Sequence, residues 1–439
     1  MQRLRIVSIA DTTYVAQAYL ETVKSAEALG FVVSHLGVAN DLWYSGGAEA
    51  AYAAGHCQVL LSPRPSGNST PWWQAADIRS EAAAALPAIA RFYQRIIREF
   101  RPHVCLIADD QGTLEVFTIR TMNDNHVPVL LLEHGFGYAF APRPPRLAQA
   151  RLGARRLRAA AAGRWRGRRA VVPEGRQLPQ LPEVRPFGRN GVCTIGAYSG
   201  FTAKELVRRG VVPRRAVRQT GFPYYDQVVR LRDQSPPCIR GKSLGQDRLL
   251  LVSSGNTRFG WPENALRDWH RDLEIAQIAA ASYDVTVRLH PGETLESLPE
   301  DIRSKLLASS ASIDFAEEPV RLVLRDYSLV VGEPSSVHQE AAILGIPSIV
   351  VARPRRPSRT QRLTIVELLE ERLNMLVLRD GDDVPATLAA ASRPEYRQAF
   401  AQALVDTGRL VYDNDGHAGR RVAETIVFQC GLEQRTSPA

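Results

Sequence analysis

Strand-length apolar runs return along nearly the whole chain, with helical stretches or turn residues between them. In the first half they are "LRIVSIA" at 4, "FVVSHLGV" at 31, "CQVLLS" at 57, "HVCLIA" at 103 and "PVLLLE" at 128. A second series follows residue 245, with "RLLLVSS", "YDVTVRLH", "SIDFAE", "YSLVVGE", "PSIVVA" and "MLVLRD". Continuous apolar strands alternating with helices are typical of parallel sheets covered on both faces. The pattern therefore predicts an α/β fold.

The length of the chain and its two series of strands together predict two domains. A chain of 439 residues is too long for one ordinary core. We expect two tandem Rossmann-like, doubly wound parallel-sheet domains that face each other across a cleft. The first takes residues 1–231, a linker takes 232–246, the second takes 247–393, and a helical segment at 394–439 is long enough to pack back on the first domain. Open sheets of this kind bind ligands outside the carboxyl ends of their strands.

The composition excludes several classes of protein. No run of 18 uncharged apolar residues is present to span a bilayer, and the start "MQRLRIVSIADTTYV" lacks a signal-peptide core, so we expect cytoplasmic residence. The 5 cysteines lie far apart without metal-ligand spacing, which predicts reduced, structural thiols and no metal. The absence of GxGxxG after the first strand, and of GxxxxGK[ST], argues against a dinucleotide oxidoreductase and a P-loop kinase.

The segment "LVVGEPSSVHQEAAILGIP", residues 329–347, predicts a strand, a sharp turn and a helix. Ser336 and Gln339 fit a capping box, and Gly345 closes the helix. The unpaired N–H groups of the first helical turn, with the hydroxyls of Ser335 and Ser336, suit a nucleotide phosphate. The alternative is that the serines only cap the helix.

The strand "VTVRLHPGE", residues 285–293, ends on Arg288 and His290. In a sheet of this order it opens on the same crevice as the helix that begins at the two serines, so both side chains could contact phosphate oxygens. His290 could also protonate a departing phosphate. The alternative is that the His-Pro pair only forms a turn.

Two strand ends of the first domain carry acidic residues. Asp109 and Asp110 end the strand in "HVCLIADDQGTLE", and alternation along an extended segment lets at most one of them face the cleft. That one could be the base that deprotonates an acceptor hydroxyl; alternatively Asp110 caps the next helix and Asp109 starts a turn. The following strand ends on Glu133, His134 and Gly135, where Glu133 is another candidate base and Gly135 allows close approach of a ligand.

Together these motifs resemble the two-domain, GT-B-fold transferases of bacterial surface polysaccharide synthesis. "RLHP" with "PSSVHQEAAILGIP" is similar to the His-Pro and Ser-Ser motifs of the polysialyltransferase and capsule transferase group, and "IADDQG" to its acidic motif. "EHGFGY" and "TGFPYYD" resemble the CDP-glycerol glycerophosphotransferases. "HQEAAILGIPSIVV" is similar to the nucleotide end of the UDP-N-acetylglucosamine 2-epimerases, although "SIADTTYVAQ" is unlike that family's start.

The resemblance implies roles for individual residues. His290 and Ser335/Ser336 would hold the phosphate of the donor nucleotide, and Asp109 or Asp110 would be the base. Gln111 departs from the acidic motif, because it stands between the acidic pair and Gly112. The glycerophosphotransferases tend to have an acidic residue before the serines, where this chain has Gly332 and Glu333, so Glu333 joins the substrate-binding candidates.

Residues 141–170 carry ten arginines and no acidic residue. Leu147, Leu152, Leu157 and Trp165 are spaced like one face of a helix, the pattern of a peripheral membrane helix drawn to anionic lipid. A solvated basic loop and a contact with an acidic glycan are the alternatives. We expect no nucleic-acid partner, because zinc-finger spacing, RNP-like motifs and aromatic residues interleaved with the basic ones are all missing.

The sequence therefore predicts a cytoplasmic glycosyltransferase at the inner face of the cell membrane, without cofactor or metal. Its donor is a nucleotide-sugar, with a CMP-sugar favoured, and its acceptor is a surface polysaccharide or glycolipid. The alternatives are a CDP-glycerol-type glycerophosphotransferase, a UDP-sugar 2-epimerase-like enzyme, and a non-catalytic glycan- or lipid-binding assembly protein.

Overall fold

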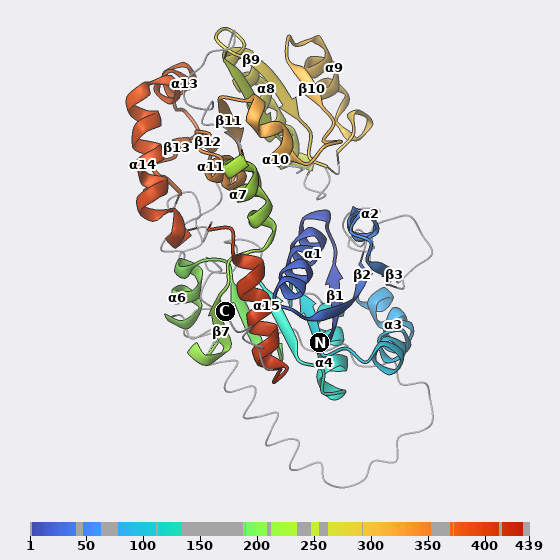
Figure 1. The fold of residues 1–439 in the computed structure, drawn as a ribbon. Coiled ribbons are helices and arrows are strands. Elements are labelled where there is room, and N and C mark those ends of the chain that lie inside the picture. Colours follow the sequence, from blue (N-terminus) through green and yellow to red (C-terminus); the bar gives the residue numbers. More distant parts are fainter. Residues whose placement is uncertain are drawn as a thin grey trace, which may run out of the picture.

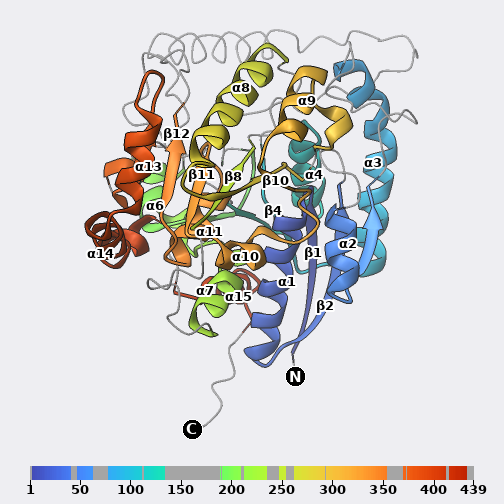
Figure 2. The same cartoon turned by 90° about the horizontal axis from the view of Figure 1, so that it is seen from above.

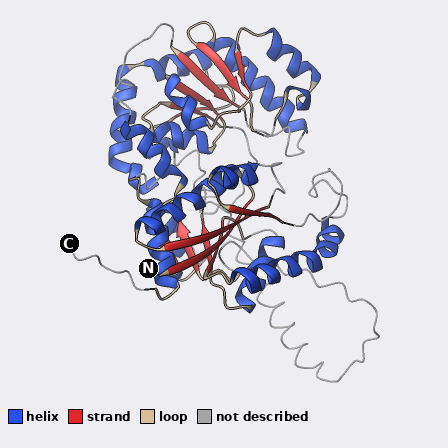
Figure 3. Cartoon of the chain, turned by 45° about the vertical axis from the view of Figure 1, so that its right-hand side comes forward, coloured by secondary structure: helices blue, strands red, loops and turns tan. Residues whose placement is uncertain are grey.

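Two parallel β-sheets, each with helices on both sides, make up the protein (Figures 1 and 3). The computed structural model describes residues 2–40, 47–62, 78–110, 113–133, 188, 190–208, 212–234, 247–253, 262–291, 293–352, 369–371, 373–411 and 415–432. Among these residues, no helix is long and apolar enough to cross a membrane. The predicted α/β architecture with two parallel sheets is confirmed.

The first sheet has 7 parallel strands in the order β3-β2-β1-β4-β5-β6-β7. They are β1 (Arg3–Ala10), β2 (Val32–Ala39), β3 (Gln58–Leu61), β4 (Val104–Ile107), β5 (Val129–Leu132), β6 (Thr194–Ala197) and β7 (Val217–Gln219). Every residue of β4 and β5 is buried, because helices cover both faces of the sheet. The strands β1 to β5 fall on the five apolar runs of the first half of the sequence, and β6 and β7 extend the sheet beyond them.

The helices of this half connect successive strands. They are α1 (Thr13–Ala28), α2 (Gly47–Ala54), α3 (Ile78–Phe100), α4 (Thr113–Asp124), α6 (Gly200–Arg208) and α7 (Tyr224–Gln234), with a short 3-10 turn η3 (Arg214–Ala216). The hydroxyl of Thr12 caps α1 by accepting a hydrogen bond from the N–H of Val15 at 3.3 Å.

The second sheet has 6 parallel strands in the order β10-β9-β8-β11-β12-β13. They are β8 (Arg248–Val252), β9 (Asp284–Arg288), β10 (Ser312–Asp314), β11 (Leu329–Gly332), β12 (Ser348–Val351) and β13 (Leu376–Leu378). The helical elements of this half are α8 (Pro262–Ala279), η5 (Leu295–Ser297), α9 (Glu300–Ala308), α10 (Val320–Val323), η6 (Leu324–Asp326), α11 (Ser336–Ile343) and α13 (Val384–Ser392).

The strand order creates one switch point in each sheet. β1 pairs with β2 on one side and β4 on the other, and β8 pairs with β9 and β11. Connections leave in opposite directions at such a point, which opens a crevice at the carboxyl ends of the two central strands. The residues after β1 and β4, and those after β8 and β11, are therefore placed to meet a ligand.

One apolar core cluster joins the two halves of the molecule. It runs from Leu132 of β5 through Phe222 to Leu250 of β8. Separate clusters fill the outer face of each sheet. α11 contacts both α10 and α7; the three helices lie next to one another in Figures 1 and 2, and they lie above α1 in Figure 1. The two domains therefore share a packed interface beside their facing strand ends.

The last two helices connect the second half of the chain with the first. α14 (Pro394–Val411) contacts both α13 and α6, and α15 (Ala418–Gln429) lies along α1 (Figure 1). The carboxylate of Asp226 on α7 accepts hydrogen bonds from the N–H groups of Ala418 and Gly419, at 2.9 and 2.7 Å. Two of the N–H groups at the start of α15 are satisfied in this way. The division of the chain at residues 232–246 stays a proposal, and α7 runs to Gln234.

Candidate functional site

A cavity of about 670 Å³ lies between the facing strand ends of the two sheets. The first half contributes residues 11–14 and the side chains of Gln17 and Tyr224, and the second half contributes residues 288–291, 316–321 and 335–337 among others. This volume is typical of small-molecule sites, which commonly form between domains. We call this cavity the cleft.

Ser335 and Ser336 lie on the wall of the cleft formed by the second domain. Ser335 is the N-cap residue of α11, with φ −147° and ψ 170°, but its hydroxyl caps no backbone N–H. Both serines are exposed, and neither hydroxyl forms a hydrogen bond with the described part of the chain. Their hydroxyls and the first N–H groups of α11 are therefore available to an anion.

The predicted capping box between Ser336 and Gln339 is wrong. Gln339 is buried, and its side-chain carbonyl accepts hydrogen bonds from the hydroxyls of Tyr198 and Tyr225 in the first domain. The side chain that would have closed the box thus joins the two domains instead. The predicted end of the helix is confirmed, since Gly345 follows α11 in the left-handed region with φ +77°.

His290 lies in the turn after β9 and lines the cleft. Its backbone N–H donates to the hydroxyl of Ser253 at 2.8 Å and to the carboxylate of Glu293 at 3.1 Å. Ser253 follows β8 and also donates to Glu293. The turn is therefore fixed by the ends of the neighbouring strands β8 and β9, which positions His290 in the cleft beside the switch point of the second sheet.

Arg288 also lines the cleft, but its guanidinium is already paired. It forms an ion pair with Asp314 at the end of β10 and donates to the carbonyl of Glu318. Only 5% of the residue is exposed. Arg288 thus contributes a neutralised ion pair to the cleft rather than an isolated cation.

Glu333 is not among the residues that line the cleft. It directly follows β11, and its carboxylate lies close enough to Asp272 to raise the pKa of that buried acid, in addition to the effect of burial. Its backbone carbonyl accepts a hydrogen bond from Nε2 of the buried His338 at 2.9 Å. The structure therefore keeps Glu333 apart from the other residues expected to bind substrate.

The two aspartates after β4 have different surroundings. Asp110 is fully buried, and its carboxylate accepts hydrogen bonds from the N–H of Gly188 at 2.8 Å and from the side-chain amide of Asn190 at 3.0 Å. Burial raises the pKa of Asp110 to about 6. Asp109 is half-buried and lines a small pocket at the strand ends. Of the pair, Asp109 is the one that faces a cavity.

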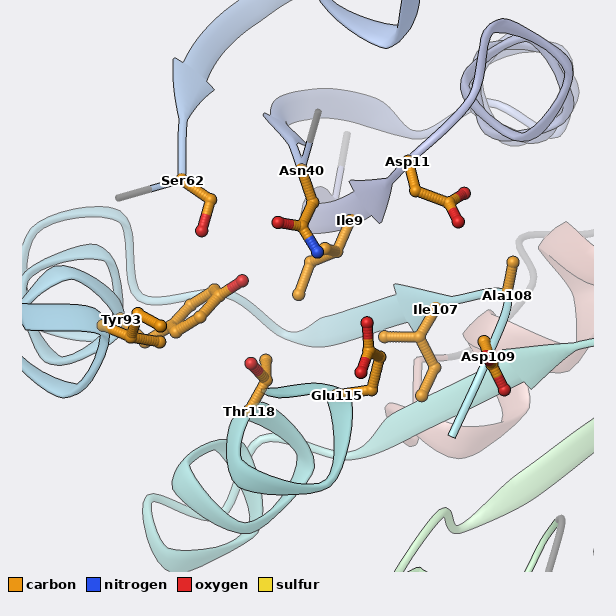
Figure 4. Close-up of a pocket in the computed structure, with 11 residues that line it drawn as sticks. Ile9, Asp11, Asn40, Ser62, Tyr93, Ile107, Ala108, Asp109, Glu115 and Thr118 are labelled. Atoms are coloured by element: carbon orange, nitrogen blue, oxygen red, sulfur yellow. The ribbon is translucent and has the colours of Figure 1, made fainter. Parts of the chain in front are cut away.

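The small pocket has a volume of about 30 Å³, close to that of one water molecule, and lies at the carboxyl ends of β1 to β4 (Figure 4). Asn40, Tyr93 and Thr118 line it together with carboxylates. Asp11, which follows β1, lines both this pocket and the cleft. Burial raises the pKa of Glu115 to about 7, and the neighbouring aspartates add to the shift. The pocket is therefore an acidic recess that adjoins the cleft through Asp11.

Glu133, the other candidate base, is fully buried and lines neither cavity. Its carboxylate accepts a hydrogen bond from the N–H of Tyr198 at 3.0 Å, and burial raises its pKa to about 7. This geometry makes Glu133 a connection between β5 and β6. His134 and Gly135 lie outside the described residues, as does the arginine-rich segment 141–170.

The structure adds cleft residues that the sequence analysis missed, namely Asp11, Tyr224, Arg321 and Glu340. Asp11 could have been found by applying the strand-end rule to the first strand as well as to the fourth. Glu340 lies four residues after Ser336, and so on the same face of α11. No spacing rule singles out Arg321 or Tyr224. Within the described part of the chain, no group of His, Cys, Asp and Glu is arranged to hold a metal ion.

Comparisons with known proteins identify the fold. No protein-family model matches the chain, and no curated protein matches it. Among solved structures, a UDP-N-acetylglucosamine 2-epimerase is 14% identical with a TM-score of 0.60, over 100% of this chain and 99% of that one. The UDP-GlcNAc 2-epimerase of Neisseria meningitidis, bound to UDP-GlcNAc, is 12% identical with a TM-score of 0.55, over 98% and 100%. The wall teichoic acid polymerase TagF is 9% identical with a TM-score of 0.53, over 98% and 89%.

The chain has the two-domain GT-B fold. The fold that the sequence resemblance implied is thus confirmed, whereas the narrower resemblance to the polysialyltransferase and capsule transferase group stays a proposal. A shared fold does not fix a reaction, so function must be argued from the cleft.

Proposed function

We propose that this protein is a nucleotide-sugar-dependent glycosyltransferase whose donor binds in the cleft. The observation that carries the proposal is the pair of exposed serines at the start of α11, whose hydroxyls are not used to cap the helix. Helix N-termini with added hydroxyl donors suit phosphate groups. The UDP-GlcNAc-bound epimerase of similar fold supports a nucleotide-sugar as the class of ligand.

The second domain would stabilise the departing nucleotide. The phosphate would accept hydrogen bonds from Ser335, Ser336 and the backbone at the start of α11. His290, which lines the same cleft, would donate a proton or a hydrogen bond to the phosphate as the glycosidic bond breaks. Donors fixed in advance stabilise developing charge without rearranging, and this is commonly the largest contribution to catalysis.

The first domain would hold the acceptor and supply the base. Asp109 is the favoured base because it is half-buried and lines a cavity, while Asp110 and Glu133 are fully buried and line none. The carboxylate of Asp109 accepts a hydrogen bond from the N–H of Asp110 at 2.7 Å, which orients it. Asp11 connects the pocket of Asp109 with the cleft, so an acceptor hydroxyl entering between them would approach a carboxylate. Asp109 would take the proton as the hydroxyl attacks the sugar.

The identities of the donor and the acceptor are further parts of the proposal. We keep the CMP-sugar as the favoured donor, on the basis of the sequence resemblance, and a surface polysaccharide or glycolipid as the acceptor. Peripheral attachment to the inner face of the cell membrane through residues 141–170 would bring a lipid-linked acceptor to the cleft.

A UDP-sugar 2-epimerase-like activity is the second candidate, because two 2-epimerases match the fold over nearly their whole length. An epimerase acts on the nucleotide-sugar alone, whereas a transferase needs an acceptor. The resemblance of "EHGFGY" and "TGFPYYD" to the CDP-glycerol glycerophosphotransferases likewise keeps CDP-glycerol as an alternative donor. These candidates share the nucleotide site and differ in what the first domain does.

The proposal is tested by thermal unfolding of the purified protein with CMP, CDP, UDP, GDP and dTDP. We expect one nucleotide to raise the melting temperature of the wild type, and His290→Ala and Ser336→Ala to reduce that increase. The controls are His270→Ala and Ser304→Ala, which alter the same residue types on the exposed faces of α8 and α9. If none of the five nucleotides stabilises the wild type, the proposed function is wrong and the assembly role takes its place.

Turnover then separates the candidates. Release of free nucleotide that depends on an added glycan acceptor supports the transferase. A change in sugar configuration in UDP-GlcNAc without any acceptor would instead establish the epimerase.

A further inference from the structure

Arg321, on α10, is a cation of the cleft that forms no ion pair with a carboxylate of the described residues. Its Nη1 donates to the side-chain carbonyl of Gln17 on α1 and to the hydroxyl of Tyr224 on α7, both at 3.1 Å. The guanidinium also lies over the ring of Tyr224, 5.1 Å from its centre. All these contacts are with neutral groups of the first domain. Arg288 differs in this respect, because its guanidinium forms an ion pair with Asp314.

The remaining hydrogen-bond donors of Arg321 are available to a ligand. The guanidinium carries five N–H donors, and Nε and Nη2 make no hydrogen bond with the described residues. Only 9% of the residue is exposed. Nε and Nη2 nevertheless keep some contact with solvent, because neither belongs to the fully buried polar atoms that have no hydrogen-bond partner. These two nitrogens therefore reach the cleft from a mostly buried side chain. Burial raises the pKa of Glu340 to about 7 and the charge of Arg321 partly offsets that shift, so Arg321 already has an acid nearby. An anionic ligand would add direct hydrogen bonds to Nε and Nη2.

Arg321 is linked to α11 through the hydroxyl of Tyr224. Glu340 lies one helical turn beyond Ser336, and its carboxylate accepts a hydrogen bond from the hydroxyl of Tyr224 at 3.0 Å. Tyr224 in turn accepts from Arg321. One helical turn and two hydrogen bonds thus separate the serines from the guanidinium along this route. A phosphate bound at the serines leaves Nε and Nη2 of Arg321 for another group.

We propose that Arg321 forms a second anion subsite in the cleft, for a donor that carries an anionic group besides the phosphate bound at α11. This inference rests on the proposed function. A guanidinium edge fits a carboxylate or a phosphate with two parallel hydrogen bonds. The group is therefore either the carboxylate of an acidic sugar or the second phosphate of a nucleoside diphosphate. Gln17 and Tyr224 are positioning residues, because they orient the guanidinium from the first domain.

The test is isothermal titration of wild type and Arg321→Gln with CMP, CDP, UDP and CMP-linked sialic acid. The subsite predicts little change in the dissociation constant of CMP, because its single phosphate binds at α11. It predicts binding about 10- to 100-fold weaker for the ligand that carries the second anionic group, the usual effect of losing hydrogen bonds to a charged group. Weaker binding of CDP and UDP would identify a phosphate, and weaker binding of CMP-linked sialic acid alone would identify a carboxylate.

Two further variants separate binding from folding. Tyr224→Phe keeps the ring but removes the hydroxyl that orients Arg321, so it should weaken the same ligand by a smaller factor and leave CMP unchanged. Arg325→Gln is the matched control on the neighbouring turn, where the guanidinium donates to the carbonyl of Leu231 outside the cleft. It should bind every ligand as the wild type does.

Several results would overturn the subsite without touching the proposed function. These are equal weakening of CMP and the larger ligands by Arg321→Gln, or no weakening of any of them. If the wild type binds no nucleotide, the proposed function fails, and pyrophosphate becomes the probe for Arg321. Pyrophosphate binding that Arg321→Gln loses would support the anion subsite alone, and absence of pyrophosphate binding would overturn it as well.

Discussion

The polar groups at the strand ends of the two domains are arranged differently. On the second-domain wall, the hydroxyls of Ser335 and Ser336 are exposed and not used to build the fold. On the first-domain side, Asp110 and Glu133 are fully buried and accept hydrogen bonds that connect neighbouring segments. Exposed hydroxyl donors can bind an anionic ligand. Burial raises the pKa values of Asp110 and Glu133, which favours their protonated forms. We infer that the second domain binds the anion through the exposed serines, whereas the buried acids Asp110 and Glu133 of the first domain support the fold.

The largest effect is expected from Asp109→Asn. If Asp109 is the base, the substitution removes proton transfer and lowers kcat by about 100- to 10,000-fold, with little change in KM for the donor. Initial rates at saturating acceptor and varied donor measure both constants.

Asp110→Asn provides the comparison on the adjacent residue. It weakens the contacts to Gly188 and Asn190, so the free energy of unfolding should fall by about 1–3 kcal/mol while the remaining folded protein keeps its activity. The account would be contradicted if Asp110→Asn abolished turnover in a stable protein and Asp109→Asn did not.

The next effect concerns stability and pH. Glu133 has a pKa of about 7 in the folded protein, raised by burial from 4.5, so the folded state binds its proton more tightly than the unfolded state. The free energy of unfolding should therefore fall as pH rises from about 4.5 to about 7, by about 3 kcal/mol from this residue. Glu115 and Glu340 are buried acids whose pKa values are raised in the same way. Glu133→Gln removes only one ionisable group, so the difference in unfolding free energy between this variant and the wild type gives the contribution of Glu133 alone.

Urea unfolding of wild type and Glu133→Gln at pH 5 and pH 8 measures this share. We expect Glu133→Gln to be the more stable of the two at pH 8, and to remain active because Glu133 lines neither cavity. An inactive but well-folded Glu133→Gln would reinstate this residue as the candidate base.

The smallest effect tests whether the serines are free of a structural role. The double variant Ser335→Ala, Ser336→Ala should weaken nucleotide binding by about tenfold while leaving the free energy of unfolding nearly unchanged. Asp383→Ala is the matched comparison, because the carboxylate of Asp383 does cap α13, accepting from the N–H of Ala386 at 2.9 Å. That variant should lose about 1 kcal/mol of stability and bind nucleotide normally. Equal losses of stability in both would show that the serines are caps.

The sequence predicted the elements that depend on local pattern. The strands β1 to β5 and β8 to β13 fall on the apolar runs, whereas β6 and the short edge strand β7 (VRQ) do not, and only the first residue of β7 is buried. The left-handed position of Gly345 was likewise predictable from its place after a helix. Alternation implied that at most one of Asp109 and Asp110 faces the cleft; Asp109 lines the adjoining small pocket, and Asp110 lines neither cavity.

Contacts between distant parts of the chain account for what the sequence did not predict. Gln339 fits a capping box locally, yet its partners Tyr198 and Tyr225 lie 141 and 114 residues away. Arg288 has the sequence context of a phosphate ligand, but Asp314 on the adjacent strand pairs with it. Arg321 was missed because its place in the cleft depends on two side chains of the other domain. None of these pairings leaves a short-range pattern.

The most direct test of the division between the two walls is a crystal structure of the protein with the nucleotide that stabilises it most. The account predicts phosphate oxygens within hydrogen-bond distance of the hydroxyls of Ser335 and Ser336 and of the first N–H groups of α11, with His290 beside them. A nucleotide whose phosphate lies instead against the first domain, near Asp11 or Asp109, would contradict it.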